Sequence, residues 1–102
     1  MNVVLYLCDG VFDGPGELQF RAPEVGGRHK FLLFLRQESR NASSAEAIRE
    51  ARRFGFGSIS VLNGKPLEVE SLSSAQGFAK HYEEALAEES SLVWYPRATD
   101  GA

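Results

Sequence analysis

Hydrophobic and polar positions follow two periods along this chain, and each change of period marks the border of a predicted element. Short apolar or alternating runs predict six strands, at residues 3–8, 17–21, 31–35, 58–62, 67–70 and 91–95. Apolar residues spaced three and four positions apart predict two helices, at about 44–54 and 74–89. The pattern therefore predicts a mixed domain in which every helix leads into a strand.

The two predicted helices begin with closely similar four-residue sequences. Ser43-Ser44-Ala45-Glu46 precedes the first helix, and Ser73-Ser74-Ala75-Gln76 precedes the second. In such a capping box the serine hydroxyl accepts a hydrogen bond from a free backbone N–H of the first turn, while the Glu or Gln side chain reaches back. The repeated pattern therefore predicts a helix start at both places.

Turn-forming residues then suggest how the strands connect. Residues 9–16 are rich in Gly, Asp and Pro and predict a loop, and Asn63-Gly64 predicts a hairpin between strands 58–62 and 67–70. From about residue 30 the order becomes β-α-β-β-α-β, the ferredoxin-like split βαβ arrangement, preceded by an extra N-terminal strand pair. The expected fold is a two-layer α+β sandwich with a mainly antiparallel sheet.

Right-handed crossovers would place both helices on one face of this sheet. Residues 3–8 and 31–35 are apolar at consecutive positions, so their side chains point to both faces. A row that includes Leu32 and Phe34 would then be uncovered, and a patch of that kind usually has a partner. We expect either the N-terminal loop or a second copy of the chain to cover it, and we favour a two-fold homodimer.

Composition changes this picture little. The 102 residues, 43% of them hydrophobic, predict one domain at 1–96 and a disordered tail at 97–102. A net charge of −3 argues against a general nucleic-acid binder. The single cysteine, Cys8, favours a reducing compartment, and no apolar stretch approaches the roughly 20 residues of a membrane span. These features predict a cytoplasmic protein without membrane attachment.

One segment resembles a nucleic-acid motif. Residues 55–61 resemble part of the longer aromatic motif of RNA-recognition domains, and residues 5–7 resemble the shorter one. That resemblance implies bases stacked on aromatic side chains of the sheet. However, Ser58 and Val61 stand at two of those positions, and the segment follows the first helix, whereas the motif belongs on the third strand. RNA binding is therefore the third of three functional hypotheses.

The N-terminal loop carries the second hypothesis, a small ligand-binding protein or enzyme. Asp9, Asp13 and Glu17 lie close together in sequence, and closely spaced carboxylates are ligands that calcium prefers. The spacing of a calcium-binding loop is missing, so turn formation is the simpler interpretation. If the loop does bind a ligand, Asp9 and Asp13 are the candidate residues, with His29 beside them.

Charged stripes on the helices supply the remaining candidates. Arg49 and Arg53 lie late in the first helix, within pairing distance of acidic residues one turn away, so a self-paired face is expected. His81, Glu84 and Glu88 share one stripe of the second helix, but a lone histidine without a second His or Cys is a poor metal site. We predict no catalytic residues, no metal and no cofactor.

The leading hypothesis is therefore a small non-enzymatic protein-interaction or regulatory domain. Its support is that no catalytic arrangement survives inspection, and that the acidic stripe of the second helix and the surplus aromatic strand residues suit recognition. The expected partner is a protein, with a second copy of this chain as one candidate.

Overall fold

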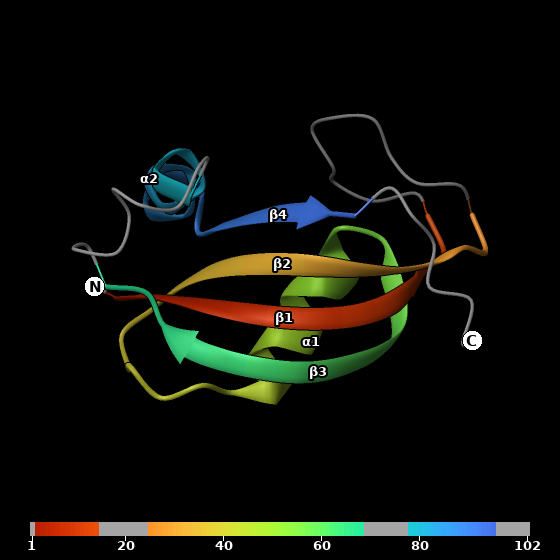
Figure 1. Ribbon diagram of the computed structural model, residues 1–102, viewed down its shortest axis with the longest axis horizontal. Coiled ribbons are helices and arrows are strands. Elements are labelled where there is room, and N and C mark those ends of the chain that lie inside the picture. The colour runs from red at the N-terminus through yellow and green to blue at the C-terminus, as the bar shows by residue number, and fades with distance from the viewer. Residues whose placement is uncertain (1, 15–24, 69–77, 96–102) are drawn as a thin grey trace.

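The computed structural model describes residues 2–14, 25–68 and 78–95. These residues form six elements, in the order β1 (Asn2–Phe12), β2 (Arg28–Gln37), α1 (Ser44–Arg53), β3 (Phe56–Pro66), α2 (Phe78–Glu88) and β4 (Ser90–Trp94). The strands make one four-stranded sheet in the order β3-β1-β2-β4, and every neighbouring pair is antiparallel. Figure 1 shows β1 and β2 as the two central strands.

The small α+β domain expected from the sequence is confirmed, but the ferredoxin-like order is not found. The predicted hairpin at Asn63-Gly64 does not form, because β3 continues through both residues to Pro66. Gly64 instead lies against the ring of Tyr6 on β1, and a Cβ on this glycine would stand 2.8 Å from that ring. The glycine therefore permits a close approach between neighbouring strands, a role that its sequence context does not distinguish from a turn.

The N-terminal loop also begins later than predicted. β1 extends through Asp9, Gly10 and Val11 to Phe12, where the sequence predicts turns. Gly10 makes this extension possible, because a Cβ there would lie 3.1 Å from the Gly57 carbonyl oxygen on β3. The predicted strands 17–21 and 67–70 and the tail 97–102 lie wholly or partly outside the described residues.

The helices lie on opposite faces of the sheet, not on the same face. Ala47 and Ala51 of α1 pack on one face, with Tyr6 and Leu33. Ala85 of α2 packs on the other face, with neighbouring residues of β1 and β2 (Figure 1). We call these the α1 face and the α2 face. The domain therefore has three layers, and the predicted two-layer sandwich is wrong.

The strand directions explain this arrangement. Because β2 and β3 are both antiparallel to β1, they run parallel to each other, and α1 is a crossover helix between parallel strands. Crossovers between parallel strands of one sheet are almost always right-handed, and this rule determines the face that α1 covers. β3 and β4 are antiparallel, so the rule does not determine the face that α2 covers. Val3, Leu5 and Phe34 all point to the face opposite α1, and α2 buries them there.

The single cysteine lies in the core of the α1 face. Cys8 is free and fully buried, and burial raises the pKa of its thiol to about 12, with a smaller contribution from the neighbouring Asp9 charge. The thiol is therefore protonated at neutral pH and packs as a small hydrophobic group.

No helix in the described ranges is long and apolar enough to cross a bilayer.

Candidate functional site

The acidic candidates of the N-terminal segment do not meet at one point. The Asp9 carboxylate pairs with the Arg28 guanidinium, which also donates a hydrogen bond to the Ser58 carbonyl oxygen at 3.3 Å. Asp13 is exposed at the end of β1, and its carboxylate lies over Gly57. Glu17 lies outside the described residues. Within the described ranges, no three His, Cys, Asp or Glu side chains gather as a metal site would require.

His29 lies on the other side of the sheet from Asp9. The His29 ring is buried on the α1 face, in edge-to-face contact with Trp94, and its Nδ1 lies 2.8 Å from the Tyr95 carbonyl oxygen. Asp9 follows Cys8, which faces α1, so its own side chain points to the α2 face. The structure therefore separates His29 from Asp9, while Glu17 and the rest of this loop lie outside the described residues, so ligand binding there stays a prediction.

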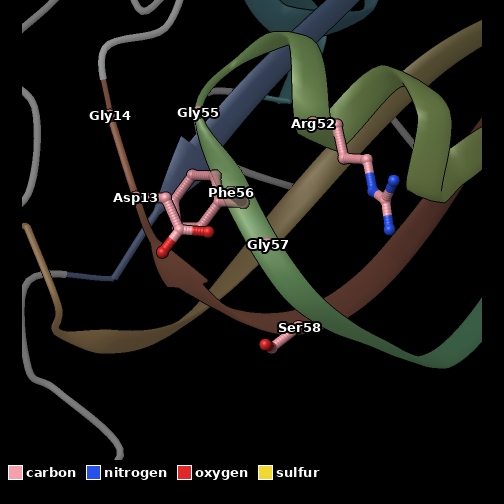
Figure 2. Close-up of a pocket in the computed structure, with 7 residues that line it drawn as sticks. All are labelled: Asp13, Gly14, Arg52, Gly55, Phe56, Gly57 and Ser58. Carbon is pink, nitrogen blue, oxygen red and sulfur yellow. The ribbon is translucent and has the colours of Figure 1, made fainter.

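A hollow of about 420 Å³ opens where α1 leads into β3 (Figure 2). Gly55 ends the helix with a φ of 103°, and its carbonyl oxygen accepts hydrogen bonds from the N–H groups of Asp13 and Gly14, at 2.7 and 3.2 Å. In Figure 2 the Asp13 carboxylate and the Arg52 guanidinium lie on opposite sides of β3. The hollow therefore has one cation and one anion at its borders.

The candidate arginines of α1 form ion pairs within their own helix. Arg49 lies 3.6 Å from Glu46, and Arg53 lies 2.5 Å from Glu50. The Arg53 guanidinium also stands over the Phe54 ring, 5.2 Å from its centroid. The pairing expected from the sequence is present. The Arg49–Glu46 pair is exposed and contributes little to stability, whereas the Glu50 carboxylate of the other pair is largely buried.

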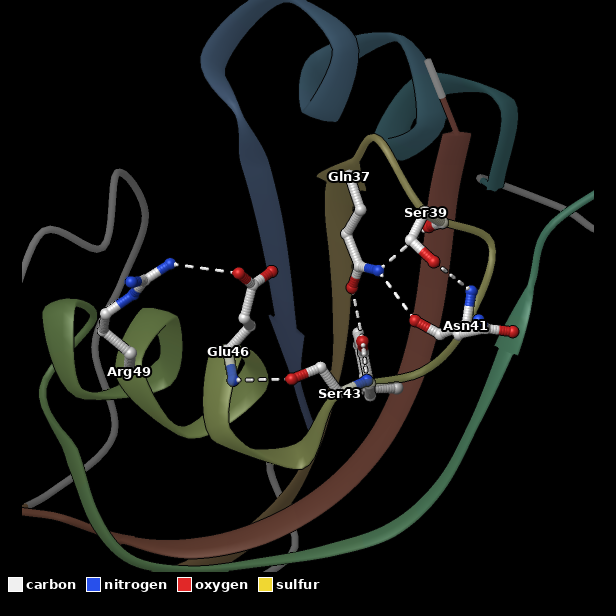
Figure 3. Close-up of polar contacts among 7 residues, drawn as sticks. Gln37, Ser39, Asn41, Ser43, Glu46 and Arg49 are labelled. Atoms are coloured by element: carbon white, nitrogen blue, oxygen red, sulfur yellow. Dashed lines mark hydrogen bonds and ion pairs between the residues drawn. The ribbon is translucent and has the colours of Figure 1, made fainter.

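A polar cluster at the other end of α1 was not foreseen (Figure 3). The fully buried Tyr6 hydroxyl donates to Gln37 Oε1 and accepts a hydrogen bond from the Ser43 N–H at 2.8 Å. Gln37 Nε2 in turn donates to the carbonyl oxygens of Ser39 (3.1 Å) and Asn41 (3.0 Å). The cluster fixes the loop between β2 and α1. Burial is also the main cause that raises the pKa of Tyr6.

The same cluster holds the start of α1. The Ser43 hydroxyl accepts a hydrogen bond from the Glu46 N–H at 3.3 Å, so the predicted N-cap is confirmed. The corresponding cap at Ser73 lies outside the described residues. A hollow of about 560 Å³ adjoins this loop, between Arg36 and Arg49. Every buried side-chain polar atom in the described ranges has a partner, so the polar groups of this cluster stabilise the loop through hydrogen bonds within the chain.

Two consecutive serines connect β4 to both helices. Ser90 donates to Glu50 on α1 at 3.1 Å and accepts from Arg53 at 3.0 Å. Ser91 points to the opposite face and donates to Glu84 on α2 at 2.9 Å. Both serines are almost completely buried, so their hydroxyls serve as internal connections.

Ser91 contacts two of the three candidates on α2. His81 Nδ1 lies 2.8 Å from the Ser91 oxygen, and because the Ser91 hydroxyl donates to Glu84, the His81 Nδ1–H is the donor in this contact. The His81 ring also stacks on Phe34, with centroids 5.3 Å apart. Glu88 follows one turn after Glu84 on the same side of the helix and is exposed. Ser91 therefore joins His81 and Glu84, and Glu88 is not part of this contact.

The environment of His81 predicts a pH-dependent stability. Burial lowers the pKa of His81 below its ordinary value of 6.5; Glu84 opposes this shift and Lys80 adds to it. The unfolded chain then binds a proton at a higher pH than the folded chain does, so the free energy of unfolding should fall as the pH drops below about 6.5. Urea titrations between pH 5 and pH 8 measure this slope.

The matched control for that measurement is His81→Asn, whose amide keeps a donor near the Nδ1 position. This variant should lose the part of the slope just below pH 6.5 and keep the part that comes from the carboxylates. An identical pH profile in both proteins would show that His81 is not shielded from water in this way.

The α2 face is left partly open beyond the helix. Neighbouring positions on three strands carry apolar side chains there, which we call the apolar row: Leu7, Leu32 and Val93. All three are half-buried. On β3 the partner of Leu7 is Asn63, and Leu62, which is 52% exposed, lies beside it where the register shifts. Phe34, which the sequence analysis placed in this uncovered row, is instead completely buried under α2.

Neither the row nor the polar clusters can be interpreted by similarity to known proteins. No protein-family model, no curated protein and no solved structure matches this chain.

Proposed function

We propose that this protein is a small non-enzymatic protein-interaction domain whose contact surface is the apolar row on the α2 face. The observation that supports this proposal is the row itself, since apolar side chains from β1, β2 and β4 lie side by side and stay partly accessible. Continuous apolar patches of this kind are typical of interaction surfaces. The charged candidates, by contrast, are largely engaged in contacts within the chain.

The favoured occupant is a second copy of the chain. The charged side chains next to the row are Asp9, Arg28 and Lys30, with Asp13 beyond them, so both signs are present in equal number. A strongly acidic or basic partner would leave one of these signs uncompensated. A copy related by a two-fold axis presents the same apolar row and the same mixture of charges, and sheets readily pack face to face.

The size of the open face limits the affinity. Strands lie about 4.8 Å apart and rise about 3.4 Å per residue, so the part of the α2 face that the helix leaves uncovered has an area on the order of 300 Å². A standard interface buries about 800 Å² on each partner. We therefore expect a weak, concentration-dependent dimer rather than an obligate one.

Sedimentation velocity over a range from micromolar to millimolar concentration tests this proposal. The average mass of the wild-type protein should rise toward that of two chains, and Leu7→Asp should abolish the rise because it places a charge in the row. Val25→Asp is the matched control, since Val25 is 72% exposed and lies outside the row. A strict monomer at all concentrations, or equal effects of the two variants, would contradict the proposal.

A further inference from the structure

The outer edge of β3 is a second surface with an unusual composition. β3 is eleven residues long and pairs with β1 along one edge; within the described ranges no strand pairs with its other edge. Its sequence contains one charged residue, Lys65, and no carboxylate. Natural edge strands usually carry more charge, because an open edge can accept a further strand.

Apolar side chains lie along this edge on its α1 side. Ile59 and Val61 pack against the core of the α1 face but are only partly buried. Ile48 of α1, the helix that packs against β3, is also half-buried. A strand added beside β3 would cover Ile59 and Val61 and extend the core by one position.

A cation stands near each end of the edge. Arg52 borders the hollow at the start of β3, together with Gly57 and Ser58 (Figure 2), and Lys65 lies at the far end. Both side chains are exposed, and neither forms an ion pair with a carboxylate in the described part of the chain. Asp13, the anion that borders the same hollow, lies on the opposite side of β3 from Arg52 (Figure 2). The cations near the outer edge therefore favour a segment that carries carboxylates at its ends.

We propose that the outer edge of β3 binds an extended segment of another protein as a fifth strand, apolar at alternate positions and acidic at both ends. Main-chain hydrogen bonds would supply the affinity and the alternate side chains the selectivity, as in other strand-addition complexes. A second copy fits this edge poorly. If two β3 strands paired antiparallel, Lys65 of one chain would approach Arg52 of the other, and these like charges would repel.

The geometry of β3 restricts the length of the added strand. The pairing with β1 shifts register twice, between Leu7 and Cys8 and between Asp9 and Val11, and Ser58 has a φ of 48°. Such irregularities protect an edge against indiscriminate pairing. Pro66 has no N–H to offer at the far end. The regular segment is therefore short, and the complex should be weak and reversible.

The probe is a capped seven-residue peptide, acetyl-EVTVTVE-amide, titrated into the ¹⁵N-labelled full chain and followed by the backbone amide signals. Saturable shifts should be confined to β3 and the adjacent part of α1. The peptide acetyl-KVTVTVK-amide, with the same apolar pattern and opposite charge, should bind at least tenfold more weakly. The peptide acetyl-EVTPTVE-amide, which lacks a central N–H, should also bind more weakly.

Charge variants link the binding to the named residues. Arg52→Glu and Lys65→Glu should each lower the affinity for the acidic peptide about fivefold, and both should leave self-association through the apolar row unchanged. Leu7→Asp, on β1, tests self-association separately, so the two proposals can fail independently. Equal binding of the acidic and basic peptides, shifts on the α2 face, or no binding at the highest soluble concentration would overturn the inference. Concentration-dependent shifts of β3 without peptide would assign the edge to a second copy instead.

Discussion

Replacing Phe34 by alanine should lower the free energy of unfolding by about 3–5 kcal/mol, the range found when a buried aromatic side chain is truncated. Phe34 has no exposed surface and packs between the sheet and α2, where its ring stacks on His81. Urea denaturation at neutral pH gives the value directly. The expected loss is large because the side chain of Ala85 cannot move far enough to fill the space.

This experiment separates the observed fold from the one that the sequence predicts. With both helices on one face, Phe34 would lie exposed on the other face, and its truncation would cost less than about 1 kcal/mol. Ser60→Ala is the control, since Ser60 is an exposed strand residue of the same sheet. A small loss for Phe34→Ala, similar to that of the control, would show that α2 does not cover this face.

Gly64→Ala should destabilise the protein by about 2–3 kcal/mol, as overpacking in a tight site does. The added Cβ would stand 2.8 Å from the Tyr6 ring and 3.0 Å from the Ala42 Cβ. Tyr6 cannot easily move away, because its hydroxyl is held by Gln37 and by the Ser43 N–H. Thermal or urea unfolding measures the effect.

Gly57→Ala provides a matched comparison within the same strand. A Cβ on Gly57 would meet the carboxylate of the exposed Asp13, which can rotate away. We expect less than half of the loss seen at Gly64. If the two variants lost equal stability, a general effect of glycine replacement in β3 would explain the result, and the close approach to Tyr6 would not.

Local patterns were sufficient for the elements that local physics determines. The first helix begins at Ser44 behind its Ser43 cap as predicted, and the apolar run at 31–35 forms the middle of β2. The predicted turns are wrong where glycine has two uses. Gly64 after an asparagine is typical of a turn, and Gly10 after an aspartate is too, but both glycines here serve close contacts between strands.

The face covered by α2 was beyond sequence reasoning for a different reason. That face depends on the relative direction of β3 and β4. The predicted hairpin at Asn63-Gly64 divided β3 into two strands, and the extra strand reversed the predicted direction of the strand that leads into α2. The polar cluster around Tyr6 had one weak signal, because a hydroxyl within an apolar run needs a buried partner. Its partner, Gln37, is 31 positions away, and only the pairing of β1 with β2 brings the two together.

The candidate residues show the same limit. The sequence placed His81, Glu84 and Glu88 on one stripe of the second helix, and α2 runs through all three positions. It gave no indication that Ser91 would join them, because this contact requires the turn between α2 and β4. Asp9 and Asp13 were grouped by their closeness in sequence, yet Asp9 pairs within the sheet and Asp13 lies at its end.

The two serines at the start of β4 have a consequence for how the domain opens. Ser90 is bonded to α1 and Ser91 to α2, so adjacent residues of one short edge strand are tied to helices on opposite sides. An edge strand of five residues would ordinarily be the first part of a sheet to exchange its amide hydrogens. Here its release must break contacts in both outer layers at once. Amide exchange in β4 should therefore be as slow as in the central strands, and the three layers should unfold as one cooperative unit.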